Sequence, residues 1–344
     1  MKVLVTGGAG FIGSAFVLRV LMNSLDEVVV LDALTYAGNL ANLEPVISNH
    51  RFSFVKGDIA DGALVTELMR TADSVVNFAA ETHVDRSLLD SESFVRANVT
   101  GVMTLLHAAR RHDIRMLHVS TDEVYGDIEA GHFSVETDAV LPRSPYAAAK
   151  AGGELMCRAY FVSYGADIVV TRGCNTIGPR QYPEKLVPLF ITNALRDDSL
   201  PVYGDGQQVR DWLYVDDHAA AIDLVLRNGR SGEIYNVGAG NERPNLEVIR
   251  ALLAHLGKPE SLITYVADRP GHDRRYALVW NKIRDELGWS PQRDFSATLG
   301  DTIDWYLQNP DWWRAIREEN AEFAAYYQQQ YGWRLAAVSA KVHE

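Results

Sequence analysis

The feature that most restricts the fold is a glycine-rich turn between an apolar strand and a helix near the start of the chain. Val3–Val5 is predicted as a short buried strand, and the turn after it carries Gly7, Gly10 and Gly13. Glycines here permit a tight turn, close approach of backbone to a pyrophosphate, and close packing of helix on strand. The helix predicted over residues 14–25 presents free N–H groups and its positive dipole end to an anion. The turn therefore predicts a dinucleotide site.

Asp32 indicates which dinucleotide binds. It ends a second predicted strand, Val28–Leu31, and lies 19 residues after Gly13. A carboxylate at this place hydrogen-bonds the ribose hydroxyls and repels a 2′-phosphate, so NAD is favoured over NADP.

Strand-like and helical segments alternate through the first half of the chain. Strands are predicted at 52–56, 74–80, 115–120 and 168–172, and helices at 60–70, 94–111 and 146–164. Such alternation is typical of an α/β fold with a doubly wound parallel sheet, the Rossmann arrangement.

The alternation loosens from about Pro179, where proline, glycine and aromatic residues become more frequent. We therefore assign residues 1–178 to an NAD-binding domain and residues 179–344 to a smaller, mixed α/β lobe that binds the substrate. Residues 211–238 are expected to return to the first domain.

Two predicted helices carry apolar stripes that we interpret mainly as core. The stripe on the first helix is Val99, Val102, Leu105, Leu106 and Ala109, and the second helix adds Leu155, Ala159 and Val162. The same helices are candidates for a contact between the subunits of a homodimer.

Tyr146 and Lys150 point to catalysis. Ser144 and Pro145 suit a helix start, and the i, i+4 spacing places both side chains on one helix face. A phenol has a pKa of about 10. A lysine ammonium roughly 4 Å away contributes about 4 kcal/mol at an effective dielectric constant of about 20, enough to bring that pKa near neutrality. We therefore expect Lys150 to make Tyr146 a general base.

Thr121, Asp122 and Glu123 directly follow the strand predicted at 115–120. In an open parallel sheet, polar residues at the carboxyl end of a strand lie at the ligand crevice. Two adjacent carboxyl groups can be driven to different pKa values, which suits one for acid and the other for base catalysis. A loop that caps a helix is the other interpretation of this triple.

Composition excludes several classes of protein. The net charge of −12 argues against a general nucleic-acid surface. No apolar run approaches the roughly 20 residues that span a bilayer, and Met1-Lys2 leads straight into a strand without a signal peptide. The two cysteines, Cys157 and Cys174, form no disulfide framework. We expect a cytoplasmic protein that binds neither nucleic acid nor membrane and has no metal in its site.

Together these residues resemble the extended short-chain dehydrogenase/reductase family, which pairs Gly-x-x-Gly-x-x-Gly with Tyr-x-x-x-Lys. Within it the chain is similar to the nucleotide-sugar 4,6-dehydratases from Met1 to about Trp313. The specific marks are Leu34–Asn39, Ala80–Ser87, Ser120–Gly126, Tyr203–Trp212 and Arg269–Tyr276. The acidic pair after Thr121 separates these dehydratases from sugar epimerases, which commonly lack it.

The resemblance implies NAD as cofactor and a nucleotide sugar, dTDP-glucose first, as substrate. It implies a cofactor site of Gly7, Gly10, Phe11, Ile12, Gly13, Asp32, Asp58, Ile59, Ala79, Ala80, Asn98, Ser120, Tyr146 and Lys150. It implies a substrate site of Thr82, His83, Thr121, Asn175, Glu184, Lys185, Tyr203, Arg210 and His272. Arg210 would meet the diphosphate, and Tyr203 and His272 would lie near the base and its ribose. Arg274 and Arg275 either add phosphate-binding charge or are surface charge.

The resemblance also implies a reaction with NAD regenerated. Tyr146 would remove the 4-hydroxyl proton, Thr121 would hydrogen-bond that hydroxyl, and Lys150 would hold the nicotinamide ribose. Glu123 would then take the proton at carbon 5, which becomes acidic once carbon 4 is a ketone. Asp122 would protonate the leaving 6-hydroxyl, and hydride would return to carbon 6 to give a 4-keto-6-deoxy sugar.

One departure from the family pattern bears on the sugar. Thr176 and Ile177 stand where the family usually has Asn and Tyr, whereas the preceding Asn175 is kept. A dehydratase or 4-epimerase acting on another nucleotide sugar, such as a UDP-sugar, is therefore the alternative. A non-catalytic NAD-binding regulator is a third hypothesis, but it has no need of Tyr146, Lys150 and the acidic pair together.

Overall fold

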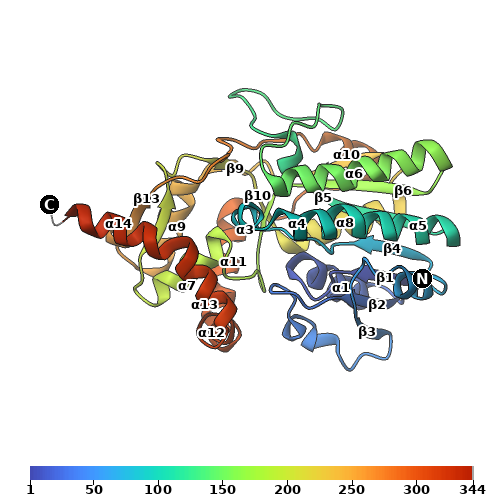
Figure 1. Cartoon of the computed structure of the whole chain (residues 1–344), viewed down its shortest axis with the longest axis horizontal. Coiled ribbons are helices and arrows are strands. Elements are labelled where there is room, and N and C mark those ends of the chain that lie inside the picture. The colour runs from blue at the N-terminus through green and yellow to red at the C-terminus, as the bar shows by residue number, and fades with distance from the viewer. Residues whose placement is uncertain (343–344) are drawn as a thin grey trace.

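A seven-stranded parallel sheet forms the body of the protein in the structure, a computed structural model that describes residues 1–342. The strand order is β11-β6-β5-β4-β1-β2-β3, and Figure 1 shows a smaller lobe to the left of this sheet. The strands are β1 (Lys2–Thr6), β2 (Glu27–Asp32), β3 (Phe52–Lys56), β4 (Ser74–Asn77), β5 (Arg115–Thr121), β6 (Ile168–Gly173) and β11 (Ile234–Val237). The predicted α/β class is confirmed.

Helices cover both faces of the sheet, which explains why its strands are continuous apolar runs. On one face α1 (Phe11–Asn23) packs against α8 (Val215–Asn228), and their apolar side chains share a core with β1. On the other face α2 (Gly62–Met69), α5 (Val102–His112) and α6 (Pro145–Tyr164) enclose a second core. The sheet is therefore doubly wound, as predicted.

Local sequence signals account for both ends of α6, the helix that carries Tyr146 and Lys150. The Ser144 hydroxyl accepts a hydrogen bond from the Ala147 N–H at 3.1 Å, and Pro145 occupies the first turn. Gly165 ends the helix in the left-handed region with φ of +65°.

The helix predicted over residues 94–111 is confirmed, but it contains a π-helical irregularity that was not predicted. The segment consists of α4 (Ser91–Val95), a π-helical turn at Arg96–Gly101, and then α5. The turn comes close to α6, because a Cβ on Gly153 would clash with the Asn98 carbonyl oxygen. Tertiary packing therefore decides the irregularity, and π turns of this kind are frequent at functional sites.

The interpretation of Leu155, Ala159 and Val162 as core residues is also wrong. All three are exposed on α6, Leu155 by 56% and Val162 by 67%. These three residues lie on the exposed face of α6, whereas Val102, Leu105 and Leu106 of α5 are fully buried.

The chain returns to the sheet after a first excursion into the smaller lobe. Strand β11 pairs in parallel with β6, with Ile234 opposite Val170. The division at residue 179 stays a prediction. No helix within residues 1–342 is long and apolar enough to span a membrane.

The smaller lobe is built around a parallel pair of strands, β8 (Leu200–Tyr203) and β13 (Ile263–Val266). Helices α7 (Leu186–Leu195), α9 (Asn245–Leu256) and α11 (Phe295–Gln308) pack on this pair. The remaining elements are α3 (Val84–Leu89), β7 (Asn175–Ile177), β9 (Val209–Arg210), β10 (Trp212–Tyr214), β12 (Arg243–Pro244), α10 (Asn281–Leu287), α12 (Pro310–Glu318), α13 (Ala321–Tyr327) and α14 (Trp333–Val342).

A buried ion pair holds α6 against β6 and yields a stability prediction. Arg172 Nε donates to both Glu154 carboxylate oxygens at 3.0 and 3.1 Å, and the two side chains are only 3% and 5% exposed. Glu154→Ala leaves the guanidinium charge buried without its partner, so we expect the free energy of unfolding to fall by about 3–5 kcal/mol.

Urea unfolding followed by circular dichroism measures this loss. The control is Glu67→Ala, which removes an exposed partner of Arg70 and should leave the unfolding midpoint unchanged. Equal midpoints for Glu154→Ala and the parent protein would contradict the prediction.

Candidate active site

A cavity of about 500 Å³ lies at the carboxyl ends of the central strands, where chain connections leave the sheet in opposite directions. It reaches from the glycine turn after β1 to the polar triple after β5. The predicted site residues that line it are Gly7, Gly10, Phe11, Ile12, Gly13, Asp32, Asp58, Ile59, Ala79, Ala80, Thr82, Ser120, Thr121, Asp122, Glu123, Tyr146, Lys150, Asn175, Glu184 and Lys185.

A second cavity, of about 160 Å³, adjoins the first on the side of the smaller lobe. The two cavities share Glu123, Asn175, Glu184 and Lys185 as lining residues. The other predicted substrate residues, His83, Tyr203, Arg210 and His272, line the second cavity. One continuous site therefore brings together the residues predicted for the cofactor and those predicted for the substrate.

The geometry of the glycine turn fits a bound dinucleotide. Gly7 has φ of +69°, and a Cβ there would lie 2.5 Å from the Ala79 backbone nitrogen. A Cβ on Gly13 would clash with the Gly7 carbonyl oxygen. Asp32 stands at the end of β2, where its carboxylate accepts hydrogen bonds from the N–H groups of Ala9 at 2.9 Å and Leu34 at 2.8 Å. Glycine is therefore required in this cradle, and Asp32 is held facing it.

Tyr146 and Lys150 are both buried in the site, but the expected effect of the lysine on the tyrosine is wrong. Burial, with the charge of Glu123, raises the pKa of Tyr146 well above its usual range. Lys150 instead donates to the Val119 carbonyl oxygen at 2.7 Å, and burial lowers the pKa of its ammonium to about 8. Desolvation outweighs the attraction that the helical spacing suggested.

The acidic pair occupies two different environments. Asp122 is only 3% exposed, and burial together with the charge of Glu123 raises its pKa well above the usual range. Glu123 is partly exposed to the cavity. The Thr121 hydroxyl accepts a hydrogen bond from the Glu123 N–H at 3.3 Å. Thr121 therefore caps the short helix that follows it, as the second interpretation of the triple predicted. Asp122 is therefore suited to remain protonated as an acid beside a carboxylate base.

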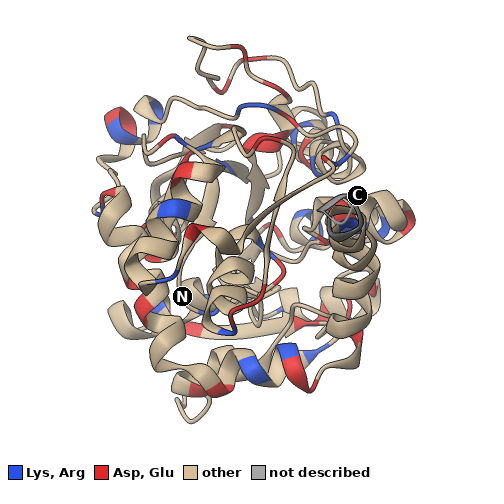
Figure 2. Ribbon diagram, turned by 90° about the vertical axis from the view of Figure 1, so that its left-hand side faces the viewer, with Lys and Arg blue, Asp and Glu red and all other residues tan. Residues whose placement is uncertain are grey.

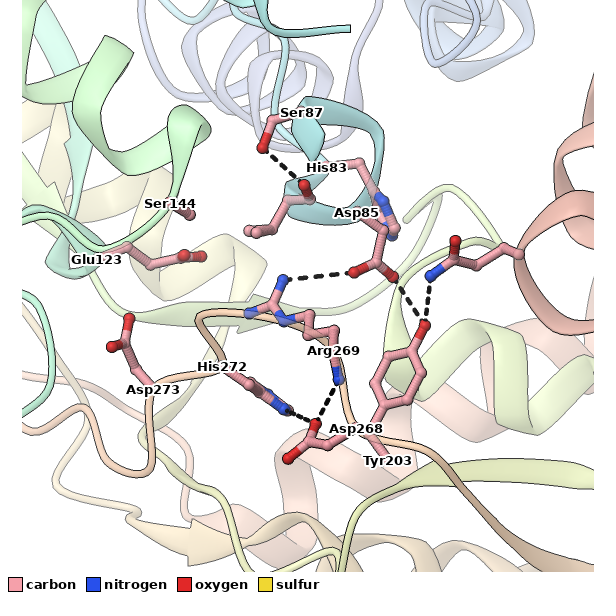
Figure 3. Close-up of polar contacts among 12 residues, drawn as sticks. His83, Asp85, Ser87, Glu123, Ser144, Tyr203, Asp268, Arg269, His272 and Asp273 are labelled. Carbon is pink, nitrogen blue, oxygen red and sulfur yellow. Dashed lines mark hydrogen bonds and ion pairs between the residues drawn. The ribbon is translucent and has the colours of Figure 1, made fainter. Parts of the chain in front are cut away.

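Tyr276 lies beside Glu123 and was not among the predicted site residues. Its hydroxyl donates to Asp273 at 2.5 Å and lies 3.4 Å from a Glu123 carboxylate oxygen; Figure 3 shows Asp273 near Glu123. The Arg210 guanidinium carbon lies 4.1 Å from the centre of the Tyr276 ring. The sequence did carry a signal for Tyr276, because this residue ends the family motif that begins at Arg269.

Arg274 and Arg275 are surface charges and do not line either cavity. Arg274 pairs with exposed Asp205 at 2.7 Å, and Arg275 donates to the carbonyl oxygens of Glu129 and His132. Figure 2, which views the molecule from the left-hand side of Figure 1, shows acidic and basic residues interspersed over the helices. The phosphate-binding interpretation of these two arginines finds no support in their contacts.

Asn98 does not line the cavity, although it was predicted to bind the cofactor. Its side-chain amide donates to the Glu81 carbonyl oxygen at 3.0 Å and accepts from the Glu81 N–H at 3.1 Å. Glu81 does line the cavity, and burial raises its pKa to about 7. Asn98 therefore contacts the site indirectly, because it holds the backbone of Glu81. Glu81 is a polar residue shortly after β4 that was not among the predicted site residues.

The two residues that depart from the family pattern have different surroundings. Thr176 lines the larger cavity, with its hydroxyl oxygen 2.8 Å from Nδ1 of buried His218. Ile177 is 1% exposed and belongs to the core of the smaller lobe. Only Thr176 is therefore placed to affect a ligand directly.

Comparison with known proteins assigns the family. Residues 4–302 match the family model described as GDP-mannose 4,6 dehydratase. The dTDP-glucose 4,6-dehydratase of Actinoplanes sp. is 51% identical over 320 residues, which are 91% of this chain and 100% of that protein.

Comparison with solved structures indicates the same family as comparison with the relatives. DesIV, the dTDP-glucose 4,6-dehydratase of Streptomyces venezuelae solved with NAD bound, superposes with a TM-score of 0.90 at 51% identity, over 92% of this chain and 100% of DesIV. The UDP-glucuronic acid 4-epimerase of Bacillus cereus has a TM-score of 0.85 but 30% identity, over 90% of this chain and 99% of its own. The chain belongs to the nucleotide-sugar dehydratase family whose model is described as GDP-mannose 4,6 dehydratase.

Proposed function

We propose that this protein is an NAD-dependent lyase that converts dTDP-glucose into a dTDP-4-keto-6-deoxy sugar. The reaction oxidises carbon 4, eliminates water across carbons 5 and 6, and returns the hydride to carbon 6. The observation that carries the proposal is the pairing of buried Asp122 with Glu123 in the same cavity as Tyr146 and Lys150. An epimerase has no elimination step and so no need of this acid and base.

NAD would be held in the cradle formed by Gly7, Gly10 and Gly13, and Asp32 would bind its adenosine ribose. When bound, NAD supplies the acceptor and later the donor of the hydride, together with a positively charged nicotinamide ring. A positive charge beside a phenol favours its ionised form, which would oppose the effect of burial and Glu123 on the pKa of Tyr146.

In the oxidation step Tyr146 takes the proton of the 4-hydroxyl. Thr121 precedes Asp122 at the end of β5 and lowers the pKa of Tyr146 through a hydrogen bond, though less than burial raises it. Lys150, which donates to the Val119 carbonyl oxygen one helical turn from Tyr146, would hold the nicotinamide ribose.

In the elimination step Glu123 takes the proton from carbon 5 and Asp122 gives a proton to the leaving 6-hydroxyl. One Asp122 oxygen, Oδ2, is buried without a hydrogen-bond partner among the described residues. A buried unpaired carboxyl oxygen is costly unless a ligand satisfies it, and the 6-hydroxyl of the sugar would do so.

The nucleotide end of the substrate would lie in the cavity on the side of the smaller lobe. Arg210 is buried there beside Tyr276, and a guanidinium suits bidentate contact with a diphosphate. Lys185, whose ammonium donates to the Thr82 carbonyl oxygen at 2.8 Å, and Glu184 would face the sugar.

A substrate panel tests the proposal directly. NAD-loaded protein incubated with dTDP-glucose should form a 4-keto sugar, detected by its absorbance in alkali, and should form far less with UDP-glucose. Recovery of only the carbon 4 epimer, or a preference for the UDP-sugar, would favour the alternative that Thr176 keeps open.

We further propose a cytoplasmic homodimer. Both cysteines, Cys157 and Cys174, are buried free thiols, as expected in a reducing compartment. Leu155, Val162 and Tyr164 of α6 and Met103 of α5 are exposed on neighbouring helices, and clustered exposed apolar side chains mark interaction sites.

The dimer is tested by charge insertion on this face. The double variant Leu155→Glu, Val162→Glu should sediment as a monomer in analytical ultracentrifugation, because two carboxylates per subunit would be buried at the interface. The control, Leu25→Glu, changes an apolar residue that is 92% exposed away from these helices and should remain dimeric. A monomeric parent protein would contradict the proposal.

Cofactor choice is tested at Asp32. Calorimetry should show NAD binding about 100-fold more tightly than NADP, since a 2′-phosphate would be placed against a carboxylate. Asp32→Asn should narrow this ratio mainly by improving NADP binding. Comparable dissociation constants for the two dinucleotides in the parent protein would contradict the assigned role of Asp32.

The acidic pair is tested by Glu123→Gln. Oxidation at carbon 4 should continue, because Tyr146 and Lys150 are unchanged, but elimination should slow by about 100- to 10,000-fold for loss of the general base. Rapid mixing should therefore show NADH absorbance that rises and persists.

Tyr146→Phe is the matched control for this experiment. It lacks the phenol needed for oxidation, so its NADH absorbance should not rise at all. Product formation by Glu123→Gln at the parental rate would show that Glu123 is not the base.

A further inference from the structure

The chain beyond residue 302, where the family model ends, returns to the substrate cavity. In Figure 1 helices α12, α13 and α14, coloured red, run along the smaller lobe. Tyr331, in the turn between α13 and α14, is 5% exposed and lines the 160 Å³ cavity together with Tyr203 and His272. A segment outside the family model thus forms part of the site wall.

Two contacts from α13 reach the loop after β4 that carries predicted substrate residues. The Tyr326 hydroxyl is hydrogen-bonded to Nδ1 of His83 at 3.1 Å, and Glu322 pairs with Arg86 at 3.4 Å. The Arg86 guanidinium also lies over the Tyr326 ring, 4.2 Å from its centre. These contacts tie α13 to one side of the cavity.

The π-helical segment that follows α13, Gln328–Gly332, reaches Tyr203 of β8. Gln330 Nε2 donates to the Tyr203 hydroxyl at 2.6 Å, and that hydroxyl donates to Asp85 at 3.0 Å (Figure 3). The rings of Tyr203 and Tyr331 are stacked at 6.0 Å with an interplanar angle of 26°. The segment therefore closes the far end of the cavity and fixes the orientation of Tyr203.

The chemistry of the cavity at Tyr203 and Tyr331 indicates which part of the substrate binds there. The catalytic residues define the sugar end and Arg210 lies between, so the end at Tyr203 and Tyr331 is where the base of a nucleotide sugar falls. Aromatic faces with adjacent polar groups suit a planar base. The roughly 160 Å³ here is continuous with the larger cavity that holds the catalytic residues, so the base end and the sugar end belong to one site.

We infer that the segment Gln330–Arg334 is a strap over the base subsite, in which Tyr331 contacts the pyrimidine base of the substrate and Gln330 holds Tyr203 in place for it. The inference rests on the proposed function only for the direction in which the nucleotide sugar lies. It assigns a binding role to residues that the dehydratase reaction itself does not use.

Calorimetry with dTDP alone and steady-state kinetics with dTDP-glucose test this on full-length, NAD-loaded protein. Tyr331→Ala should weaken dTDP binding about tenfold or more, the effect typical of losing an aromatic face under a base. It should raise KM for dTDP-glucose by a similar factor and leave kcat within about twofold, because no reacting group is changed. Gln330→Leu should act in the same direction, more weakly.

The matched control is Gln329→Leu, whose side chain is exposed and lies just before the strap; it should bind dTDP like the parent. If Tyr331→Ala does not fold, Gln330→Leu decides. Unchanged dTDP affinity in both test variants overturns the inference. Tighter dTDP binding also overturns it, because it would show that the segment blocks the site and does not contact the base. An equal loss of NAD affinity also overturns it. If the parent binds dTDP but makes no 4-keto sugar, the proposed function fails while the strap is still tested.

Discussion

Desolvation at the carboxyl end of β5 is the physical constraint on which the rest of the site depends. Burial is the largest cause of the pKa shifts of Tyr146, Asp122 and Lys150, and it favours the neutral form of each. The neutral form suits Asp122, which we propose donates a proton. For Tyr146 it is an obstacle, because a neutral phenol at high pKa is a poor base. Burial therefore suits Asp122 to the role proposed for it and opposes the role proposed for Tyr146.

The same burial requires close packing of the elements around β5. Gly7 and Gly153 allow backbones to approach where any Cβ would collide with Ala79 and with the Asn98 carbonyl. The π turn at Arg96–Gly101 lets the Asn98 amide reach both backbone groups of Glu81. These close approaches hold α6 and the loop after β4 against the sheet, and so hold Tyr146 and Glu81 at the cavity.

Sequence patterns predicted the sheet, the limits of α6 and most cavity residues, because strand alternation, helix caps and motif spacing are local properties. They failed where the outcome depends on the surroundings. The i, i+4 spacing placed Lys150 one turn from Tyr146 but could not show that its ammonium bonds the Val119 carbonyl. An apolar period on α6 marked Leu155 and Val162 without showing which face meets the sheet. Tyr331 carried no local signal at all, since its place in the cavity depends on how the last helices fold back.

Arg210 connects the two ends of the site. Its guanidinium donates to the Asp273 carbonyl oxygen at 2.9 Å and lies over the Tyr276 ring, while the Tyr276 hydroxyl bridges the carboxylates of Asp273 and Glu123. The group proposed to bind diphosphate thus packs directly on the group that orients the proposed base. The Tyr276 hydroxyl donates at 2.5 Å to Asp273 and makes a longer contact, of 3.4 Å, with Glu123. It can therefore hold the Glu123 carboxylate in position and still leave lone pairs that would accept the carbon 5 proton. On the proposed function, binding of the nucleotide and orientation of Glu123 would therefore be coupled through Arg210 and Tyr276.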